Sequence, residues 1–202
     1  MARRRDPAAQ RARRASSEAS DVFDAAVRSL SGAPRSRKSL EERLTSAGYP
    51  EAHVRAAVAR LVEIGLIDDE RYAQAILDSR DRSRPRGDRA LLQELLRRGV
   101  DEDLARGLLE RRAAGGHERT DLPGREPVPA AGDQSVGAEE RAARVALAKL
   151  RLRGGDPRVE VQRLAQGLAR RGFPSALCWR LARERVAEQA NVDLASEDLD
   201  GE

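Results

Sequence analysis

The sequence predicts an all-α protein: an elongated array of three tandem three-helix repeats, with disordered termini and a disordered insertion between the second and third repeats. One supporting observation is composition. Aromatic residues make up only 2% of the chain, charged residues 36%, and the hydrophobic 40% is mostly Ala, Leu and Val. Ala, Leu, Arg and Glu are strong helix formers, whereas a β-sandwich needs the β-branched and aromatic residues that are scarce here.

The other observation is a repeat anchored on glycine. In three segments, leucines stand eight and four positions before a glycine, an apolar residue follows the glycine, and Pro or Asp comes next. A further inward-facing residue stands six positions after the glycine. The aligned sets are Leu40, Leu44, Gly48, Tyr49, Pro50 and Val54; Leu91, Leu95, Gly99, Val100, Asp101 and Ala105; and Leu164, Leu168, Gly172, Phe173, Pro174 and Cys178.

Each of these segments is expected to form a helix–glycine–helix hairpin. Leucines at positions i and i+4 share one helical face, and a glycine four residues later can adopt the positive φ that ends a helix. Pro or Asp then opens the next helix. Amphipathic segments at 20–30, 68–80 and 138–152 precede the hairpins, so the repeating unit has three helices. For the last segment, the expected inward stripe is Ala142, Val145, Ala146, Lys149 and Leu150.

The spacing of the glycines sets the predicted organisation. They are 51 and 73 residues apart, and removal of a Gly- and Pro-rich stretch of 25 residues leaves 48 in the larger gap, which restores the period. The first 15 residues carry six Arg and one Asp, and six acidic residues but no basic one follow Val186, which favours disordered tails. The expected parts are a basic tail at 1–17, repeats at 18–65, 66–112 and 138–187, a linker at 113–137 and an acidic tail at 188–202.

Several classes of function are excluded by what the sequence lacks. It has no P-loop, no dinucleotide-binding glycines and no hydrolase nucleophile elbow, so we expect no enzyme and no cofactor. The single cysteine, Cys178, has no metal-ligand spacing with His53 or His117, so it is expected to be a small buried core residue. No long apolar run and no signal peptide are present, which predicts a cytoplasmic protein.

Basic residues recur in the connection before each hairpin. They are Arg35, Arg37 and Lys38 in the first connection, Arg80, Arg82, Arg84, Arg86 and Arg89 in the second, and Arg151, Arg153 and Arg158 in the third. Such connections can meet DNA phosphates or acidic protein surfaces, or they can simply be solvated. The density of arginine in the second connection favours partner binding there.

Residues 65–100, GLIDDERYAQAILDSRDRSRPRGDRALLQELLRRGV, carry a resemblance to a known family. The stretch resembles RecX proteins, whose hallmark is a pair of aspartates followed by Arg-Tyr-Ala, a basic run, a glycine and a Leu-rich helix that ends in glycine. The matching motif residues are Asp68, Asp69, Arg71, Tyr72 and Ala73, followed by Gly87 and Gly99. The flanking LEERLTSAGYPEAHVRAAVARLVEIG and LARRGFPSALCWRLA are also similar, and the resemblance covers roughly 20–112 and 138–187.

The resemblance implies a non-catalytic regulator of recombination and DNA repair. It implies binding to the RecA filament on DNA and inhibition of filament growth, ATP hydrolysis and strand exchange. The expected partner is the RecA filament, with weak direct contact to DNA as a second possibility, no membrane and a monomeric chain. From the residues alone, a helical DNA-binding regulator and a generic helical-repeat scaffold remain alternatives.

The aspartate pair of the motif has two interpretations. Asp68 and Asp69 begin a predicted helix, so the sequence favours capping of that helix over direct contact with a partner. Tyr72 is expected to pack its ring in the core and to leave its hydroxyl near the surface.

Overall fold

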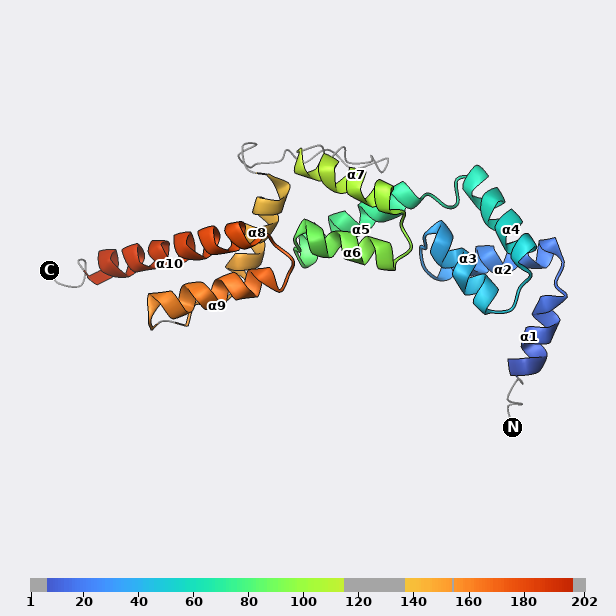
Figure 1. Ribbon diagram of the computed structural model, residues 1–202, viewed down its shortest axis with the longest axis horizontal. Coiled ribbons are helices and arrows are strands. Elements are labelled where there is room, and N and C mark those ends of the chain that lie inside the picture. Colours follow the sequence, from blue (N-terminus) through green and yellow to red (C-terminus); the bar gives the residue numbers. More distant parts are fainter. Residues whose placement is uncertain (1–6, 115–136, 154, 198–202) are drawn as a thin grey trace. The chain divides into compact units, whose positions relative to one another are not determined.

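The computed structural model describes residues 7–114, 137–153 and 155–197, which form ten helices and no strand (Figure 1). The helices are α1 (Pro7–Ala15), α2 (Ala19–Gly32), α3 (Arg37–Ser46), α4 (Glu51–Glu63), α5 (Asp69–Ser83), α6 (Asp88–Arg97), α7 (Glu102–Ala113), α8 (Ala138–Ala148), α9 (Pro157–Ala169) and α10 (Ser175–Glu197). The predicted all-α fold is therefore confirmed. None of the described helices is both long enough and apolar enough to cross a membrane.

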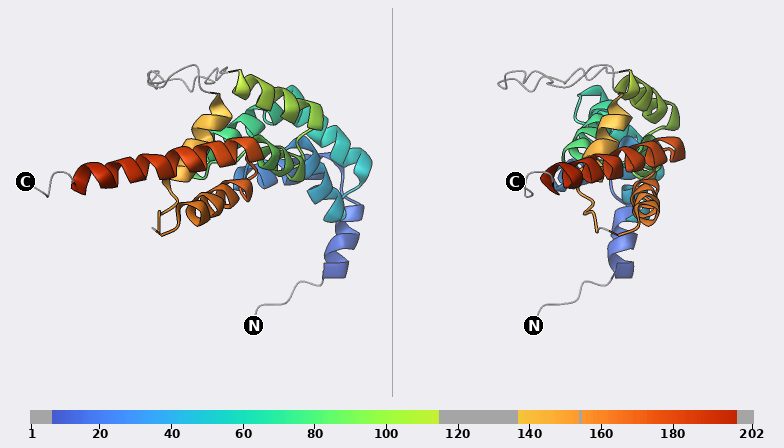
Figure 2. Two further views of the ribbon diagram at one scale, coloured as in Figure 1. Left: turned by 60° about the vertical axis from the view of Figure 1, so that its left-hand side comes forward. Right: turned by 90° about the vertical axis from the view of Figure 1, so that its left-hand side faces the viewer.

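Helices occupy part of both predicted tails. Helix α1 lies within the predicted basic tail, and α10 continues to Glu197, as one unbroken helix in Figure 2. The tail prediction followed from charge alone, but α1 is rich in Ala and Arg, which are both strong helix formers. Most of the predicted linker, residues 115–136, and the chain ends lie outside the described residues.

The three anchoring glycines adopt the predicted backbone conformation. Gly48, Gly99 and Gly172 have φ values of +98°, +77° and +85°. The apolar residues that follow the first two fold back onto the helix end, because the Tyr49 and Val100 amides donate hydrogen bonds to carbonyls five residues earlier. The residues six positions after each glycine, Val54, Ala105 and Cys178, are all buried. The helix–glycine–helix hairpins are therefore confirmed.

The chain divides into two compact units. One contains Met1–Ile76 and Leu95–Ala105, and the other contains Leu77–Glu94 and Arg106–Glu202, so the boundary passes through α5, α6 and α7. In the first unit, α2, α3 and α4 pack around one apolar cluster. Its buried members are Val22, Ala26, Leu40, Leu44, Val54, Ala57, Val58, Leu61 and Ile67.

In the second unit, α8, α9 and α10 enclose another apolar cluster. Its buried members are Ala142, Ala143, Ala146, Leu147, Leu164, Ala165, Leu168, Phe173, Cys178, Leu181 and Ala182. Cys178 is 1% exposed, and burial raises the pKa of its thiol, which fits the core role expected for it.

The inward stripe predicted for α8 is wrong at two positions. Val145 is 45% exposed, and Lys149 is exposed, with its ammonium group donating a hydrogen bond to the Ser83 carbonyl. The buried face instead consists of four alanines and Leu147. Small alanines allow close approach of α9 and α10, but they give a weak periodic signal in a sequence so rich in Ala.

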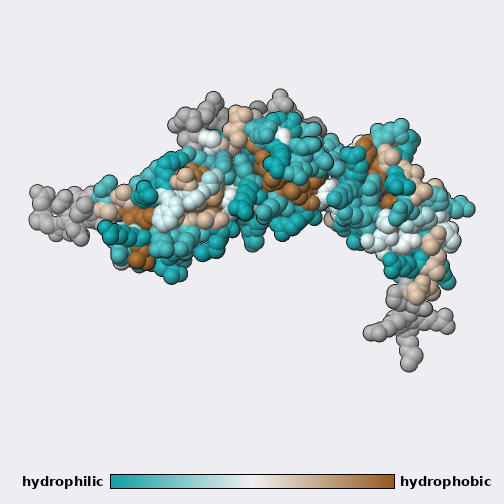
Figure 3. Space-filling model, viewed as in Figure 1, coloured by the Kyte–Doolittle hydropathy of each residue, from teal (hydrophilic) through white to brown (hydrophobic). Residues whose placement is uncertain are grey.

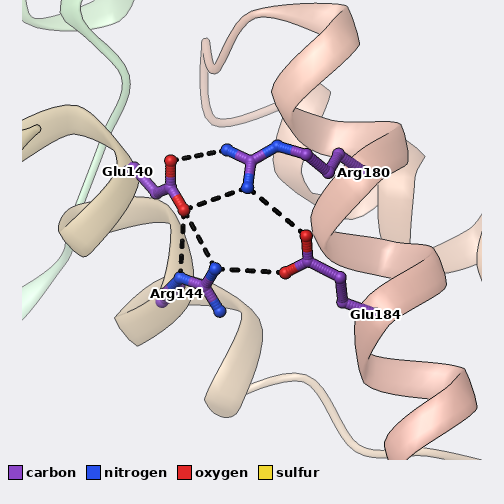
Figure 4. A network of polar contacts seen from close by, with 4 residues as sticks. All are labelled: Glu140, Arg144, Arg180 and Glu184. Carbon is purple, nitrogen blue, oxygen red and sulfur yellow. Dashed lines mark hydrogen bonds and ion pairs between the residues drawn. The ribbon is translucent and has the colours of Figure 1, made fainter. Parts of the chain in front are cut away.

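A network of ion pairs joins α8 to α10 at the surface (Figure 4). Arg180 and Arg144 both contact Glu140, and the Arg144 guanidinium also lies 3.1 Å from Glu184. Hydrogen bonds, from Arg180 above all, lower the pKa of Glu140. Because these groups are partly exposed to solvent, the network adds little to stability and chiefly fixes how the two helices align.

The turn at Gly99 packs against the start of α3 in a contact that we name the first joint. Ser36, the N-cap of α3, is fully buried, and its hydroxyl both donates to the Arg98 carbonyl at 2.6 Å and accepts from the Ser39 amide. A Cβ at Gly99 would lie only 2.7 Å from the Ser36 oxygen. The absence of a side chain at Gly99 therefore permits this contact as well as the positive φ.

The turn at Gly172 packs against the start of α6 in the second joint. Here the Gly87 amide donates to the Arg171 carbonyl at 3.0 Å. A Cβ at Gly87 would lie 2.2 Å from the Gly172 carbonyl oxygen, and a Cβ at Gly172 would lie 2.5 Å from that of Ala90. The backbones of the two segments are therefore in direct contact, and a side chain at either Gly87 or Gly172 would prevent this close approach.

At the turn of Gly48 the preceding contact comes from α1 and not from another hairpin among the described residues. The Arg14 guanidinium donates to the Ala47 carbonyl at 3.1 Å and lies 5.4 Å from the centre of the Tyr49 ring. A Cβ at Gly48 would lie 2.6 Å from Cγ of Arg11. In all three turns the carbonyl just before the glycine thus accepts a hydrogen bond from the preceding element, and α1 serves as the terminal cap of the first hairpin.

Candidate functional site

The basic residues of the second connection surround the junction of α5 and α6. Arg80 and Arg82 lie in the last turn of α5, and Arg89 lies in the first turn of α6. Buried Pro85 and Gly87 lie between the two helices. The five arginines therefore do not form one flexible loop, and the structure assigns them different roles.

Arg80 and Arg86 hold a buried carboxylate. The Glu94 side chain is 7% exposed, and its oxygens lie 2.9 Å from Nε of Arg80 and 3.5 Å from Nη1 of Arg86. A buried carboxylate left without these partners would be strongly destabilising, because its desolvation would go uncompensated. Arg80 and Arg86 therefore have a structural role, which is neither the partner binding nor the solvation considered for them from the sequence.

Arg112 is a further structural arginine, which the sequence analysis missed. Its side chain is 2% exposed and contacts Asp88 and Asp81, the latter at 2.8 Å. Burial, together with Glu139 and Asp81, raises the pKa of Asp88 to about 6, although Arg112 acts in the opposite direction. The sequence gives no signal for this pairing, because Asp81 and Asp88 stand among five arginines that are nearer to them in the chain.

Arg82, Arg84 and Arg89 remain as the candidate partner-binding surface. All three are exposed, and none has an ion pair within the part of the chain that the structure describes. The paired residues beneath them fix the ends of α5 and α6 from which they project. Three exposed guanidinium groups without ion pairs among the described residues suit a surface rich in phosphates or carboxylates.

In the first connection, too, the basic residues differ in their contacts and exposure. Arg37 lies at the start of α3, with its backbone amide donating to Asp69 at 2.8 Å and its guanidinium 3.7 Å from that carboxylate. Arg35 is half-buried, and its Nε is buried without a hydrogen-bond partner among the described residues. Lys38 is exposed.

In the third connection, the Arg151, Arg153 and Arg158 side chains are exposed. The Arg153 amide donates to buried Glu160, and the Arg158 amide is capped by Asp156. The Lys149 ammonium reaches the Ser83 carbonyl at 2.9 Å, so the third connection starts beside the end of α5. This hydrogen bond therefore joins the third connection to the second.

The aspartates of the Asp-Asp-x-Arg-Tyr-Ala motif cap helices. The Asp68 carboxylate accepts a hydrogen bond from the Arg71 amide, which caps α5, and Asp69 caps the start of α3 through Arg37. The capping interpretation is therefore confirmed for Asp68, whereas Asp69 caps α3 and not the helix that it begins. Ala73 is fully buried, whereas half-buried Tyr72 lines an apolar pocket of about 480 Å³.

On the face seen in Figure 3, hydrophobic residues gather over α4. Val62, Ile64 and Leu66, at and just after the end of this helix, are 37%, 46% and 57% exposed.

Among the described residues, no group of three His, Cys, Asp or Glu side chains is placed to hold a metal ion.

Comparison with known protein families and solved structures shows which family this chain resembles. Residues 23–61, 68–109 and 138–181 match the first, second and third three-helix domains of RecX. The regulatory protein RecX of Thermobifida fusca is 36% identical over 174 residues, covering 84% of this chain and 82% of that protein. The Streptomyces coelicolor protein of that name is 33% identical over 165 residues, covering 81% and 76%.

Solved structures show the same fold. The crystal structure of RecX from Lactobacillus salivarius superposes with a TM-score of 0.63 at 18% identity, covering 86% of this chain and 97% of that one. A second structure, of a regulatory protein RecX, gives 0.59 at 20% identity, covering 79% and 68%. The chain belongs to the RecX family of regulatory proteins.

Proposed function

We propose that this protein binds the RecA filament on DNA and inhibits filament growth, ATP hydrolysis and strand exchange. Membership of the RecX family supports the class of function. The observation that supports a binding surface is the exposed set Arg82, Arg84 and Arg89, which has no ion pair among the described residues. A filament presents DNA phosphates and acidic protein side chains together, and guanidinium groups bind both.

The test measures ATP hydrolysis by RecA on single-stranded DNA with and without this protein. Wild-type protein should slow hydrolysis, and the triple variant Arg82→Glu/Arg84→Glu/Arg89→Glu should lose most of this effect. Arg86 is left unchanged because it holds Glu94. Surface substitutions typically change stability by about 0.5 kcal/mol or less each, so circular dichroism should show an intact helical fold.

A charge-matched control is Arg55→Glu/Arg170→Glu/Arg183→Glu, at exposed arginines without ion pairs among the described residues. This control should inhibit like the wild type. Unchanged hydrolysis under excess wild-type protein at modest salt would refute the proposed function. Inhibition that disappears when DNA is raised at constant RecA would instead favour a DNA-binding regulator.

A further inference from the structure

A second basic site lies in the first unit, which does not contain the residues assigned to the filament. It is a pocket of about 690 Å³ bordered by α1, α2, α3 and the turn that follows α3. Its lining consists of Arg14, Ala25, Arg28, Ser29, Arg43, Leu44, Ser46, Ala47 and Tyr49. A volume of this size matches the pockets that hold small organic ligands.

The charges around the pocket all have one sign. Arg14, Arg28 and Arg43 come from three different helices, and no carboxylate is among the described residues that line the pocket. Arg14 is positioned by the Ala47 carbonyl and the Tyr49 ring. Arg28 and Arg43 have no ion pair in the described ranges, so their charges face the pocket uncompensated.

The pocket also has an unsatisfied hydroxyl. The Ser29 oxygen is buried and has no hydrogen-bond partner within the described parts of the chain. Ser29 lies on α2, where a buried hydroxyl normally bonds to the carbonyl one turn earlier. A buried polar atom without a partner is costly, and rotation of the Ser29 hydroxyl toward an acceptor in the pocket would remove this cost.

We propose that this pocket binds the phosphate group of a nucleotide in a nucleic acid strand. The polar side chains offered are guanidinium groups, which only donate, and hydroxyls, which can donate. Phosphate oxygens can accept from more donors at once than the two oxygens of a carboxylate. The space exceeds that of a bare phosphate and leaves room for the sugar beside Ala25, Leu44 and Tyr49.

This proposal does not depend on the proposed function. The pocket lies within Met1–Ile76, whereas Arg82, Arg84 and Arg89 belong to the other unit. Its test uses the full chain without RecA, so that failure of one proposal leaves the other intact.

The experiment measures fluorescence anisotropy of a dye-labelled oligothymidylate titrated with the protein. The variant Arg28→Ala/Arg43→Ala should bind roughly a hundredfold more weakly, about tenfold for each charged hydrogen bond lost. The slope of log affinity against log salt should fall by about 0.7 for each phosphate contact removed. The control Arg55→Ala/Arg183→Ala removes equal charge from exposed sites outside the pocket and should bind within twofold of wild type.

Ser29→Ala separates ligand binding from a structural role. Removal of an unpartnered buried hydroxyl should leave the unfolding midpoint unchanged or raised, while oligothymidylate binding weakens severalfold. A lowered midpoint together with unchanged binding would overturn the role given to Ser29.

Location and ligand class need their own measurements. An oligonucleotide that contains 4-thiothymidine should crosslink on irradiation to peptides from residues 25–49. Thymidine monophosphate should compete more strongly than inorganic phosphate, and oligoglutamate of equal charge should compete least. Wild-type affinity in the double arginine variant, adducts confined to other peptides, or equal competition by oligoglutamate would each overturn the proposal.

Discussion

The first and second joints form the same contact with different atoms. In both, the carbonyl before an anchoring glycine accepts a hydrogen bond from the start of the previous hairpin. At the first joint the donor is the buried Ser36 hydroxyl, and at the second it is the backbone amide of Gly87. These two residues are equivalent, because each stands four positions before the first leucine of its hairpin.

The difference shows what each joint requires. At the first joint a side chain supplies the donor, so this joint needs a hydroxyl at position 36. A backbone donor brings the two backbones into direct contact, so the second joint needs the absence of a side chain at position 87. Ser and Gly are chemically unlike, yet at equivalent positions of the repeat each donates a hydrogen bond to the carbonyl just before the next anchoring glycine.

Glu160 stands at the third equivalent position, and its side chain accepts hydrogen bonds where Ser36 and Gly87 donate them. Helix α9 starts before this position, and the buried Glu160 carboxylate accepts hydrogen bonds from the Arg153 amide and the Arg163 guanidinium. These hydrogen bonds, that from Arg163 above all, lower the pKa of Glu160. This start of a hairpin is therefore satisfied within its own repeat and does not dock another turn among the described residues.

The largest effect is expected from Gly87→Ala at the second joint. The new Cβ would overlap the Gly172 carbonyl, and neither backbone has room to move without breaking the hydrogen bond. We expect a loss of about 3 kcal/mol in the free energy of unfolding, at the upper end for overpacking. Urea titration followed by fluorescence of Trp179, which lies on α10 in the same unit, measures it.

The matched control is Gly107→Ala in the middle of α7, where a new Cβ would meet nothing within 4 Å. This variant should be stabilised by about 0.5–1 kcal/mol, as expected for Gly to Ala inside a helix. Equal stability of the two variants would show that the second joint is not closely packed in solution.

Ser36→Ala should produce an intermediate effect at the first joint. The substitution removes both the N-cap of α3 and the donor to the Arg98 carbonyl, at a cost of about 2 kcal/mol. Circular dichroism should detect the loss in a urea titration, while the Trp179 transition stays near that of the wild type. Ser31→Ala, at an exposed serine of α2, should change stability by less than about 0.5 kcal/mol. A Ser36 variant as stable as the Ser31 variant would contradict the role of this hydroxyl.

The smallest effect concerns pH and distinguishes the second joint from the first. Asp88 follows Gly87 directly and has its pKa raised from 3.8 to about 6, chiefly by burial. The folded protein thus binds this proton more tightly than the unfolded chain does. The stability from this group is fully present below about pH 4 and is lost as the pH rises through about 6.

Asp88→Asn should remove that dependence. Between pH 4 and pH 7, wild type should lose about 1 kcal/mol relative to the variant, because partial exposure moderates the effect. The measurement is urea unfolding at both pH values, with Asp24→Asn at an exposed site of α2 as the charge control. A wild type that gains stability relative to the variant between pH 4 and pH 7 would mean that the pKa of Asp88 is lowered instead.

The sequence by itself determined the helices of the three hairpins and the turns between them. Leucines four residues apart, followed by a glycine, specify the hairpins through local rules of helix periodicity and helix termination, and Gly48, Gly99 and Gly172 follow these rules. The Asp-Asp-x-Arg-Tyr-Ala motif likewise identified the family, and Asp68 caps its helix as expected.

Only the tertiary structure decided which arginines are free. Arg80, Arg82, Arg84, Arg86 and Arg89 look alike in the sequence, but Glu94 from the next helix engages two of them. The partners of Asp81 and Asp88 come from Arg112, more than twenty residues later in the chain. Ion pairs and joints depend on residues brought together from distant parts of the chain, and no local rule of helix formation contains that information.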